Sequence, residues 1–479
     1  MIISIAFKEF RDAWRDGRFR LGAVIVFALL GVAMLLAWQQ VERATEERQA
    51  AAALERENWL NQTDKNAHSA THYGVYVFKP VPVLSVFDRG LEPYVGNTFF
   101  LEGHRQNQAA FLPAQDATAM RRFGELTAAT ALQLLAPLLI ILLTFGALAG
   151  EREKGTLRQV LSLGVRPWKL VLGKGIGLGL VLLSLFVPVA VLGTFVMAKL
   201  TEAPEGTDAA SMDWGRMAWI TGAYSAYLAA ILATSLGVSA LARTSRSALI
   251  ILLVFWTVNA VLAPRIATDF AQRLHPTPKL ADFETEVQES LKNEGMNAHS
   301  PGGSKRQQEF IKKPLEEHGV SHPSRLPFNI QGLFMLESER LGDLVFDRHF
   351  GELWDILERQ DRVVTWSGLV APLLGVRSAS MALSGTDFTH PRHFSVAAEQ
   401  HRRTFTPILN KDEMTNMSGG HHGPAKGREL WEQLPEFDYK PPDTALAIRA
   451  AQPGLVVLAV WLVLSWGALF AAAQRLKPN

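Results

Sequence analysis

Residues 146–174, GALAGEREKGTLRQVLSLGVRPWKLVLGK, place a cluster of charges directly between two long apolar runs. The preceding run is LTAATALQLLAPLLIILLTF, at 126–145, and the following run includes GLVLLSLFVPVAVLGTFVM, at 179–197. A helix needs about 20 apolar residues to cross the hydrocarbon of a bilayer. The stretch therefore indicates a short connection between two membrane-spanning helices.

Uncharged apolar runs recur along the 479-residue chain. The first and the fifth are at the short end of the spanning range, and the others reach it. Helices of soluble proteins rarely lack charge for so long, which disfavours the alternative of a large soluble core. We therefore predict an all-α polytopic membrane protein with six transmembrane helices, at 21–38, 127–148, 176–198, 217–242, 247–263 and 454–473.

The distribution of Lys and Arg predicts the orientation of these helices. Basic residues gather in the N-terminal segment, in two connections and in the C-terminal tail, whereas TEAPEGTDAASMD on the opposite side has four acidic residues and no basic one. Short loops rich in Lys and Arg lie in the cytoplasm. We expect a multi-pass protein with both termini in the cytoplasm, with cytoplasmic segments at 1–20, 149–175, 243–246 and 474–479 and a short outer loop at 199–216.

This orientation leaves two long extracytoplasmic segments, 39–126 and 264–453. The first opens with VERATEERQAAAALERENWL, which should continue helix one beyond the membrane, and YGVYVFKPVPVLSVFDRG after it is typical of short edge strands or extended chain. The second contains three helical patterns, beginning at LADFETEVQ, SKRQQEFIK and GLFMLESER. We predict a large, mostly helical outer domain with a minor β part.

The segment WSGLVAPLLGVRSASMAL, at 366–383, is apolar but contains Pro372 and Arg377. As a seventh span it would place Arg377 within the membrane and move the C-terminus outside. We expect an amphipathic segment on the outer leaflet, and keep a re-entrant or spanning element as the alternative.

The local chemistry of the charged connection predicts two helix boundaries. Gly155 can adopt a left-handed conformation and end helix two. Thr156 suits an N-cap, with Gln159 completing a capping box. Gly164 can end the resulting short helix, and Pro167 fits the first turn of the next one.

That short helix has an apolar face formed by Leu157, Val160, Leu161 and Leu163. A rigid element between two spanning helices can transmit force from a cytoplasmic partner. It can equally rest on lipid headgroups, and the residues alone do not separate the two interpretations.

The composition excludes several classes of function. GKGIGLGL, at 173–180, lacks the spacing and the Ser or Thr of a P-loop, and small residues that let helices pack closely explain it better. The chain has no Cys, so disulfides and thiolate metal sites are excluded. A net charge of +2 gives no indication of a nucleic-acid partner, and we name no catalytic residue.

Six helices, the basic amphipathic start ISIAFKEFRDAWRDGRFR and the motif G-E-R-E-x-G-T-L after helix two resemble the permease subunit of an ABC transporter of the type-2 (ABC-2) class. The resemblance implies a coupling helix that docks on a separate ATP-binding subunit, which would bind ATP and Mg²⁺, and a second permease copy or paralogue. It also implies that 1–20 forms an elbow helix, with Phe7, Phe10 and Trp14 on it, and that Gly173-Lys174 opens helix three. The coupling residues would be Glu151, Arg152, Glu153, Gly155, Thr156, Leu157, Val160 and Leu161.

The long outer segments resemble a subgroup of bacterial permeases with an uncharacterised extracytoplasmic domain, on YGVYVFKPVPVLSVFDRGLEPYVG, MALSGTDFTHPRHF and AAEQHRR. The resemblance leaves copper-enzyme maturation as an alternative role. Imidazole and thioether groups suit copper, and all 13 His residues lie in the outer segments. That clustering is also expected without a metal, because the other segments are short or apolar. The candidate ligands are His390, His393, Met414, Met417, His421 and His422.

The resemblance thus implies a permease of the bacterial inner membrane that couples ATP hydrolysis by a partner to export, or to mechanical work on a periplasmic partner. The alternative from another class is a membrane-anchored extracytoplasmic binding or sensor protein with no ATPase partner.

Overall fold

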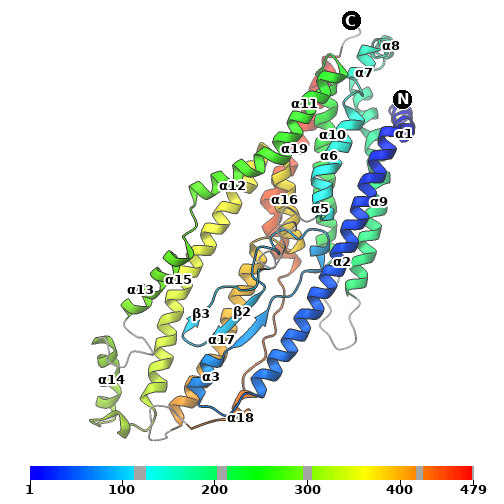
Figure 1. Cartoon of the computed structure of the whole chain (residues 1–479). Coiled ribbons are helices and arrows are strands. Elements are labelled where there is room, and N and C mark those ends of the chain that lie inside the picture. Colours follow the sequence, from blue (N-terminus) through cyan, green and yellow to red (C-terminus); the bar gives the residue numbers. More distant parts are fainter. Residues whose placement is uncertain (113–125, 202–212, 295–304, 417–423, 477–479) are drawn as a thin grey trace.

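A computed structural model of the chain describes residues 1–112, 126–201, 213–294, 305–416 and 424–476. The molecule is elongated, with a helical bundle at one end and a second body, which we call the distal domain (61–112 and 275–443 as far as described), at the other (Figure 1). Both termini lie at the end of the bundle farthest from the distal domain (Figure 1).

Six helices among the described residues are long and apolar enough to cross a membrane. They match the six predicted runs to within one residue at two boundaries and contain the others, so the prediction of six candidate spans is confirmed. Several extend well beyond the apolar run, and the first reaches Leu60, as expected. Their elements are α2 (Gly17–Leu60), α5 (Ala128–Thr130) with η2 (Ala131–Leu135) and α6 (Ala136–Thr144), α9 (Pro167–Thr201), α10 (Trp214–Leu241), α11 (Ser245–Thr257) with η3 (Val258–Leu262) and α12 (Ala263–Leu274), and α19 (Thr444–Gln474).

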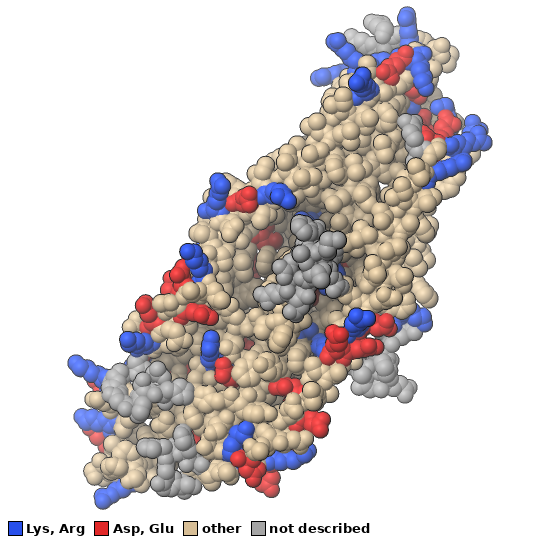
Figure 2. All heavy atoms as spheres, viewed as in Figure 1, with Lys and Arg blue, Asp and Glu red and all other residues tan. Residues whose placement is uncertain are grey.

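The bundle surface has the composition that a bilayer requires. In Figure 2 charged side chains gather at the end with the termini and over the distal domain, and the band between them is largely uncharged. Large apolar side chains are exposed there, including Leu36 of α2, Val254 of α11 and Val463 of α19. Contact with lipid tails explains this exposure, since a water-facing surface would not gather such apolar side chains.

The buried core of the bundle centres on α10. Tyr227, Ile231 and Leu236 of α10 are almost fully buried and belong to one apolar cluster with residues of α2, α6, α9 and α19. The elements η2 and η3 are π-helical turns within the second and fifth spans. A π-helical turn leaves backbone carbonyls without the usual helical partner, and such turns often lie at functional sites.

The distal domain is mostly helical, as predicted. Its helices are α3 (Ala67–Tyr73), α13 (Leu280–Glu294), α14 (Lys305–Glu317), α15 (Ile330–Trp366), α16 (Pro372–Ser384), α17 (Thr389–Thr415) and α18 (Arg428–Trp431), with 3₁₀ turns η1 (Val83–Val86), η4 (Pro323–Arg325) and η5 (Ser367–Leu369). The three helical patterns of the second outer segment correspond to α13, α14 and α15.

An antiparallel three-stranded sheet, in the order β1-β2-β3, supplies the β part. Its strands are β1 (Val75–Phe78), β2 (Thr98–Glu102) and β3 (Arg105–Gln106). The prediction of short edge strands or extended chain at 73–90 is confirmed for β1, whereas 83–86 forms the turn η1 and β2 and β3 were not anticipated. Val77, Phe99 and Leu101 face a core shared with Phe394 and Phe405 of α17.

The prediction of an amphipathic surface segment at 366–383 is wrong. These residues form η5 and α16, and most side chains of α16 are buried against α10 and α19. Trp461 Nε1 of α19 donates to the carbonyl of Gly368 at 2.8 Å, and Asn259 Oδ1 of η3 accepts the N–H of Leu373 at 3.1 Å. Arg377 is exposed on the remaining side. The helix α16 therefore attaches the distal domain to the bundle, because its apolar residues pack against α10 and α19 on one side and against Val364 of α15 on another.

Candidate functional site

The charged connection forms two short helices, α7 (Ala149–Glu153) and α8 (Thr156–Ser162), at the end with the termini (Figure 1). Gly155 and Gly164 have left-handed φ values of 71° and 79°, and α9 begins at Pro167, as predicted. The predicted capping box is wrong: Gly155 occupies the N-cap position, and the hydroxyl of Thr156 donates to the carbonyl of Glu151 at 3.2 Å.

The apolar face of α8 holds the helix on the bundle. Leu157 and Leu161 are buried in the main core, and Val160 is half-buried against it. These three residues were predicted to dock a partner. The structure buries Leu157 and Leu161 on the bundle side of α8, and their contact with a partner stays a prediction.

Two charged residues of α7 connect it to helices that are distant in the sequence. The guanidinium of Arg152 donates to the carbonyls of Ala240, at 2.6 Å, and Ala242, at the C-terminal end of α10. A cation there also interacts favourably with the helix dipole. Glu153 accepts a hydrogen bond from Ser245 at the start of α11, at 2.6 Å.

A buried lysine connects α7 to α9 and to the N-terminal helix α1 (Ile2–Arg15). Lys174 of α9 is 1% exposed, and its Nζ lies 2.9 Å from Glu151 and 2.6 Å from Glu9. Charges buried in this way are tolerated only when paired. The arrangement needs small residues on α9, because a Cβ at Gly177 would lie 2.4 Å from the carbonyl oxygen of Ala6.

The opposite face of α7–α8 is open to solvent and polar, with one exception. Leu163, directly after α8, is 84% exposed, although it is a large apolar residue. The prediction that Leu163 belongs to the apolar face with Leu157 is wrong, because α8 ends at Ser162 and Leu163, which follows it as the C-cap, is exposed. We call this surface the α8 face; it comprises Lys154, Thr156, Arg158, Gln159 and Leu163, all exposed.

The helix α1 has one side on the bundle and one side exposed. Phe10 packs against the main core, whereas Phe7 and Trp14 are exposed together with Ile3. Positions 3, 7 and 14 lie within a narrow angle on a helix, so they form an apolar stripe. Such a stripe beside a bundle suits insertion at a membrane interface.

A hydrogen-bonded chain joins the second span to the distal domain. Gln133 Nε2 of η2 donates to the hydroxyl of Tyr224 at 2.8 Å, and Tyr224 lies 3.0 Å from the hydroxyl of Ser380 on α16. Ser380 donates to the buried carboxylate of Asp88, which follows η1. Each hydroxyl can accept from one neighbour and donate to the next, so the whole chain is satisfied in one direction.

The π-helical turns supply further links. Tyr227 donates to the backbone carbonyl of Gln133 at 3.0 Å, and Trp256 donates to that of Leu134 at 3.0 Å. Asn259 of η3 lies 3.4 Å from the Tyr227 hydroxyl and also accepts from α16. Side chains of α10 and α11 thus donate hydrogen bonds to backbone carbonyls of η2 that lack the usual helical partner.

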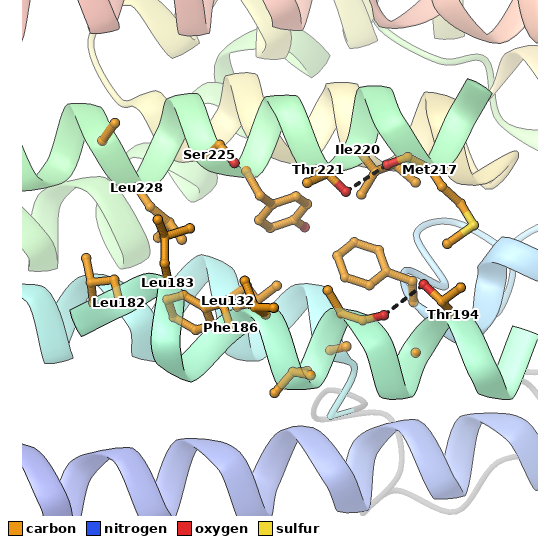
Figure 3. A pocket seen from close by; sticks show the side chains of 18 of the residues that line it. Leu132, Leu182, Leu183, Phe186, Thr194, Met217, Ile220, Thr221, Ser225 and Leu228 are labelled. Atoms are coloured by element: carbon orange, nitrogen blue, oxygen red, sulfur yellow. Dashed lines mark hydrogen bonds between the residues drawn. The ribbon is translucent and has the colours of Figure 1, made fainter. Parts of the chain in front are cut away.

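A cavity of about 510 Å³ lies between α9 and α10 (Figure 3). Its wall is mainly aliphatic and aromatic, with Leu183, Phe186 and Leu228 among the lining residues. The hydroxyls of Thr194 and Thr221 donate to carbonyls of their own helices, as Figure 3 shows. The chemistry of this wall suits an acyl chain or an apolar side chain.

The structure separates the metal-ligand candidates predicted from the sequence. His390 contacts Asp387 and Arg216, and His393 lies 3.0 Å from the hydroxyl of Tyr439. Met414 lies on the same helix as His390 but roughly 36 Å away by helical rise. The remaining candidates, Met417, His421 and His422, lie outside the described residues.

Comparison with known families agrees with this architecture. A model described as ABC-2 family transporter protein matches residues 3–295. A second, described as Domain of unknown function (DUF3526), matches residues 281–440, most of the second distal segment. No curated protein matches the chain in a sequence search. Since the first match covers more than half of the chain, including five of the six candidate spans, the chain belongs to the ABC-2 family of transporter proteins.

Proposed function

We propose that this chain is the permease subunit of an ATP-driven transporter in a bacterial inner membrane, and that α7–α8 is its coupling element. A separate ATP-binding subunit docks from the cytoplasm on the α8 face and on α1. A second permease copy or a paralogue completes the membrane part. ATP and Mg²⁺ bind to the partner, because this chain has no P-loop sequence.

One observation supports this proposal most strongly. The α7–α8 element is exposed on one side and attached to four candidate spans on the other. The chain itself joins it to α6 and α9, Arg152 joins it to α10, and Glu153 joins it to α11. Movement of a partner bound to the exposed side would displace several spanning helices together, because each of them is attached directly to α7–α8.

The proposed output is mechanical work of the distal domain on an extracytoplasmic partner. The chain from Gln133 through Tyr224 and Ser380 to Asp88 links a spanning helix to that domain. The helix α16 adds apolar contacts with α10 and α19. Movement of the second and fourth spans would therefore reach the distal domain without passing through a flexible linker.

Purification from native membranes tests the proposal. The protein should co-purify with a subunit that contains a Walker A sequence, and the complex should hydrolyse ATP. Substituting the Walker A lysine of that subunit should abolish hydrolysis without dissociating the complex. Recovery of the chain in membranes without any ATP-binding subunit would instead support the anchored binding or sensor protein.

A further inference from the structure

Three histidines of the distal domain lie together, although they come from two parts of the sequence. His68 and His72 are one turn apart on α3 and so share a face of that helix. His104 lies in the turn between β2 and β3. The ring centroids are 4.7 Å apart for His68 and His72, 5.3 Å for His72 and His104, and 5.6 Å for His68 and His104. One ring nitrogen of each lies within 4.8 Å of the other two.

The backbone holds His104 against α3. The N–H of Gly103 donates to the carbonyl of Thr71 at 3.0 Å, and a Cβ at Gly103 would lie 1.9 Å from Thr71 Cγ2, so only glycine allows this approach. His104 itself has a φ of 65°, in the left-handed region that is unfavourable for residues with a side chain. Such strain persists where the surroundings impose it, often at functional sites.

A buried carboxylate stands behind His104. Oε1 of Glu339, on α15, lies 2.7 Å from Nδ1 of His104 and accepts the backbone N–H of the same residue at 2.7 Å. The other carboxylate oxygen accepts from the buried Arg402 of α17 at 2.9 Å. The ion pair with Arg402 thus holds the Glu339 carboxylate in place beside His104.

This combination is typical of metal ligands. A histidine that binds a metal usually directs its other ring nitrogen to a carboxylate, which fixes the ring and makes it a better ligand. Since Nδ1 of His104 faces Glu339, an ion would bind His104 through Nε2. Imidazole suits zinc, copper, nickel and iron, whereas calcium and magnesium prefer oxygen.

We propose that His68, His72 and His104 bind a divalent first-row transition-metal ion of the zinc type. Zinc takes histidine nitrogens at about 2.0–2.1 Å in a tetrahedral arrangement, with a fourth position that stays open when the protein supplies three ligands. The three rings are close enough for one ion to reach a nitrogen of each, since these nitrogens lie within 4.8 Å of one another. This site shares no residue with the candidates predicted from the sequence, and it does not depend on the proposed ATP-driven function.

Metal binding would join α3 to the β2–β3 turn and, through Glu339, to α15 and α17. The expected consequence is a more stable distal domain, because an ion that binds only the folded state stabilises it. The test uses the full-length protein in detergent, stripped with EDTA, dialysed and titrated with Zn²⁺, Co²⁺ or Mg²⁺.

We expect one Zn²⁺ per chain, a Zn²⁺-dependent rise in Tm and visible absorption of tetrahedral Co²⁺ that Zn²⁺ abolishes. Mg²⁺ should have no effect. His72→Ala should weaken Zn²⁺ binding at least tenfold and leave the metal-free Tm unchanged, because His72 is exposed. Glu339→Gln keeps all three ligands and should weaken binding about 10- to 100-fold. His322→Ala, which removes an exposed histidine elsewhere in the domain, should bind like the wild type.

Two results would overturn the proposal. One is the absence of saturable Zn²⁺ binding to the stripped protein. The other is binding by the His72→Ala protein with wild-type affinity and stoichiometry, which would assign the ion to other residues.

Discussion

Nζ of Lys174 lies 2.6 Å from Oε1 of Glu9, so the N-terminal helix is fixed to the third span by a buried ion pair that also includes Glu151. The pair joins residues 165 positions apart in the sequence. The attachment of α1 and the attachment of α7 to α9 therefore depend on one side chain.

Replacing this lysine should be strongly destabilising. Lys174→Met leaves the half-buried carboxylates of Glu9 and Glu151 without this buried cation, and removal of one partner from a buried pair costs about 3–5 kcal/mol. Unfolding of the purified protein in detergent measures the loss. Lys8 provides the matched control, because it lies 3.5 Å from Glu9 but is exposed. Lys8→Ala should change stability by about 0–1 kcal/mol, and equal effects of the two variants would contradict the assignment.

The exposed Leu163 should be a contact for the ATP-binding subunit. Leu163→Glu should reduce the amount of that subunit recovered with the permease by at least about fivefold, which corresponds to the 1 kcal/mol or more expected of a central interface residue. The free energy of unfolding of the Leu163→Glu protein should equal that of the wild type. The control is Leu344→Glu, which replaces another exposed leucine, on α15 of the distal domain. The ATP-binding subunit should be recovered with this variant in the wild-type amount. Normal recovery with Leu163→Glu would exclude the α8 face as the docking surface.

The hydrogen bonds that join Gln133, Tyr224, Ser380 and Asp88 should contribute cooperatively to the free energy of unfolding. Tyr224→Phe removes the hydroxyl between Gln133 and Ser380, and a buried polar group without a partner costs about 1–3 kcal/mol. In a double-mutant cycle with Ser380→Ala, the effects should be non-additive by about 0.5–3 kcal/mol. Thr221→Val on the same helix is the control, because its hydroxyl bonds only within α10. Additive effects of Tyr224→Phe and Ser380→Ala would show that these hydrogen bonds do not couple the bundle to the distal domain.

Asp361 of α15 should make stability depend on pH. Burial, reinforced by the carboxylates of Asp387 and Glu358, raises its pKa from 3.8 to about 6. Between these two values the folded state holds a proton that the unfolded state has lost, so the stability contributed by this group is present below pH 3.8 and falls as pH rises to about 6. Asp361→Asn should therefore gain stability relative to the wild type as pH rises through this window. Parallel pH profiles of the two proteins in chemical unfolding would contradict the shift.

The spans and the boundaries of the connection could be predicted because both depend on local sequence. An uncharged run of sufficient length specifies a spanning helix. Helix ends are specified equally locally, by the backbone preferences of Gly155, Gly164 and Pro167. The capping box was predicted on the same basis and failed, because Gly155 took the N-cap position.

Features that depend on distant partners could not be predicted in the same way. Ser380 and Asp88 are 292 positions apart, and α16 reads as a surface segment until α10 and α19 are placed beside it. The cluster of three histidines could not be predicted for the same reason, because His104 contacts α3 only where Gly103 lies against Thr71. The metal-ligand candidates predicted from the sequence were residues that are close to one another along the chain.

The central claim is that the α8 face lies in the cytoplasm, where an ATP-binding subunit can push on it. The chain contains no cysteine, so a single Arg158→Cys substitution gives a unique reporter on this face, and Lys312→Cys on α14 reports on the distal domain. A membrane-impermeant thiol reagent, with the outer membrane opened, should label residue 312 and should label residue 158 only after the inner membrane is disrupted. Labelling of residue 158 in cells with an intact inner membrane would contradict the account.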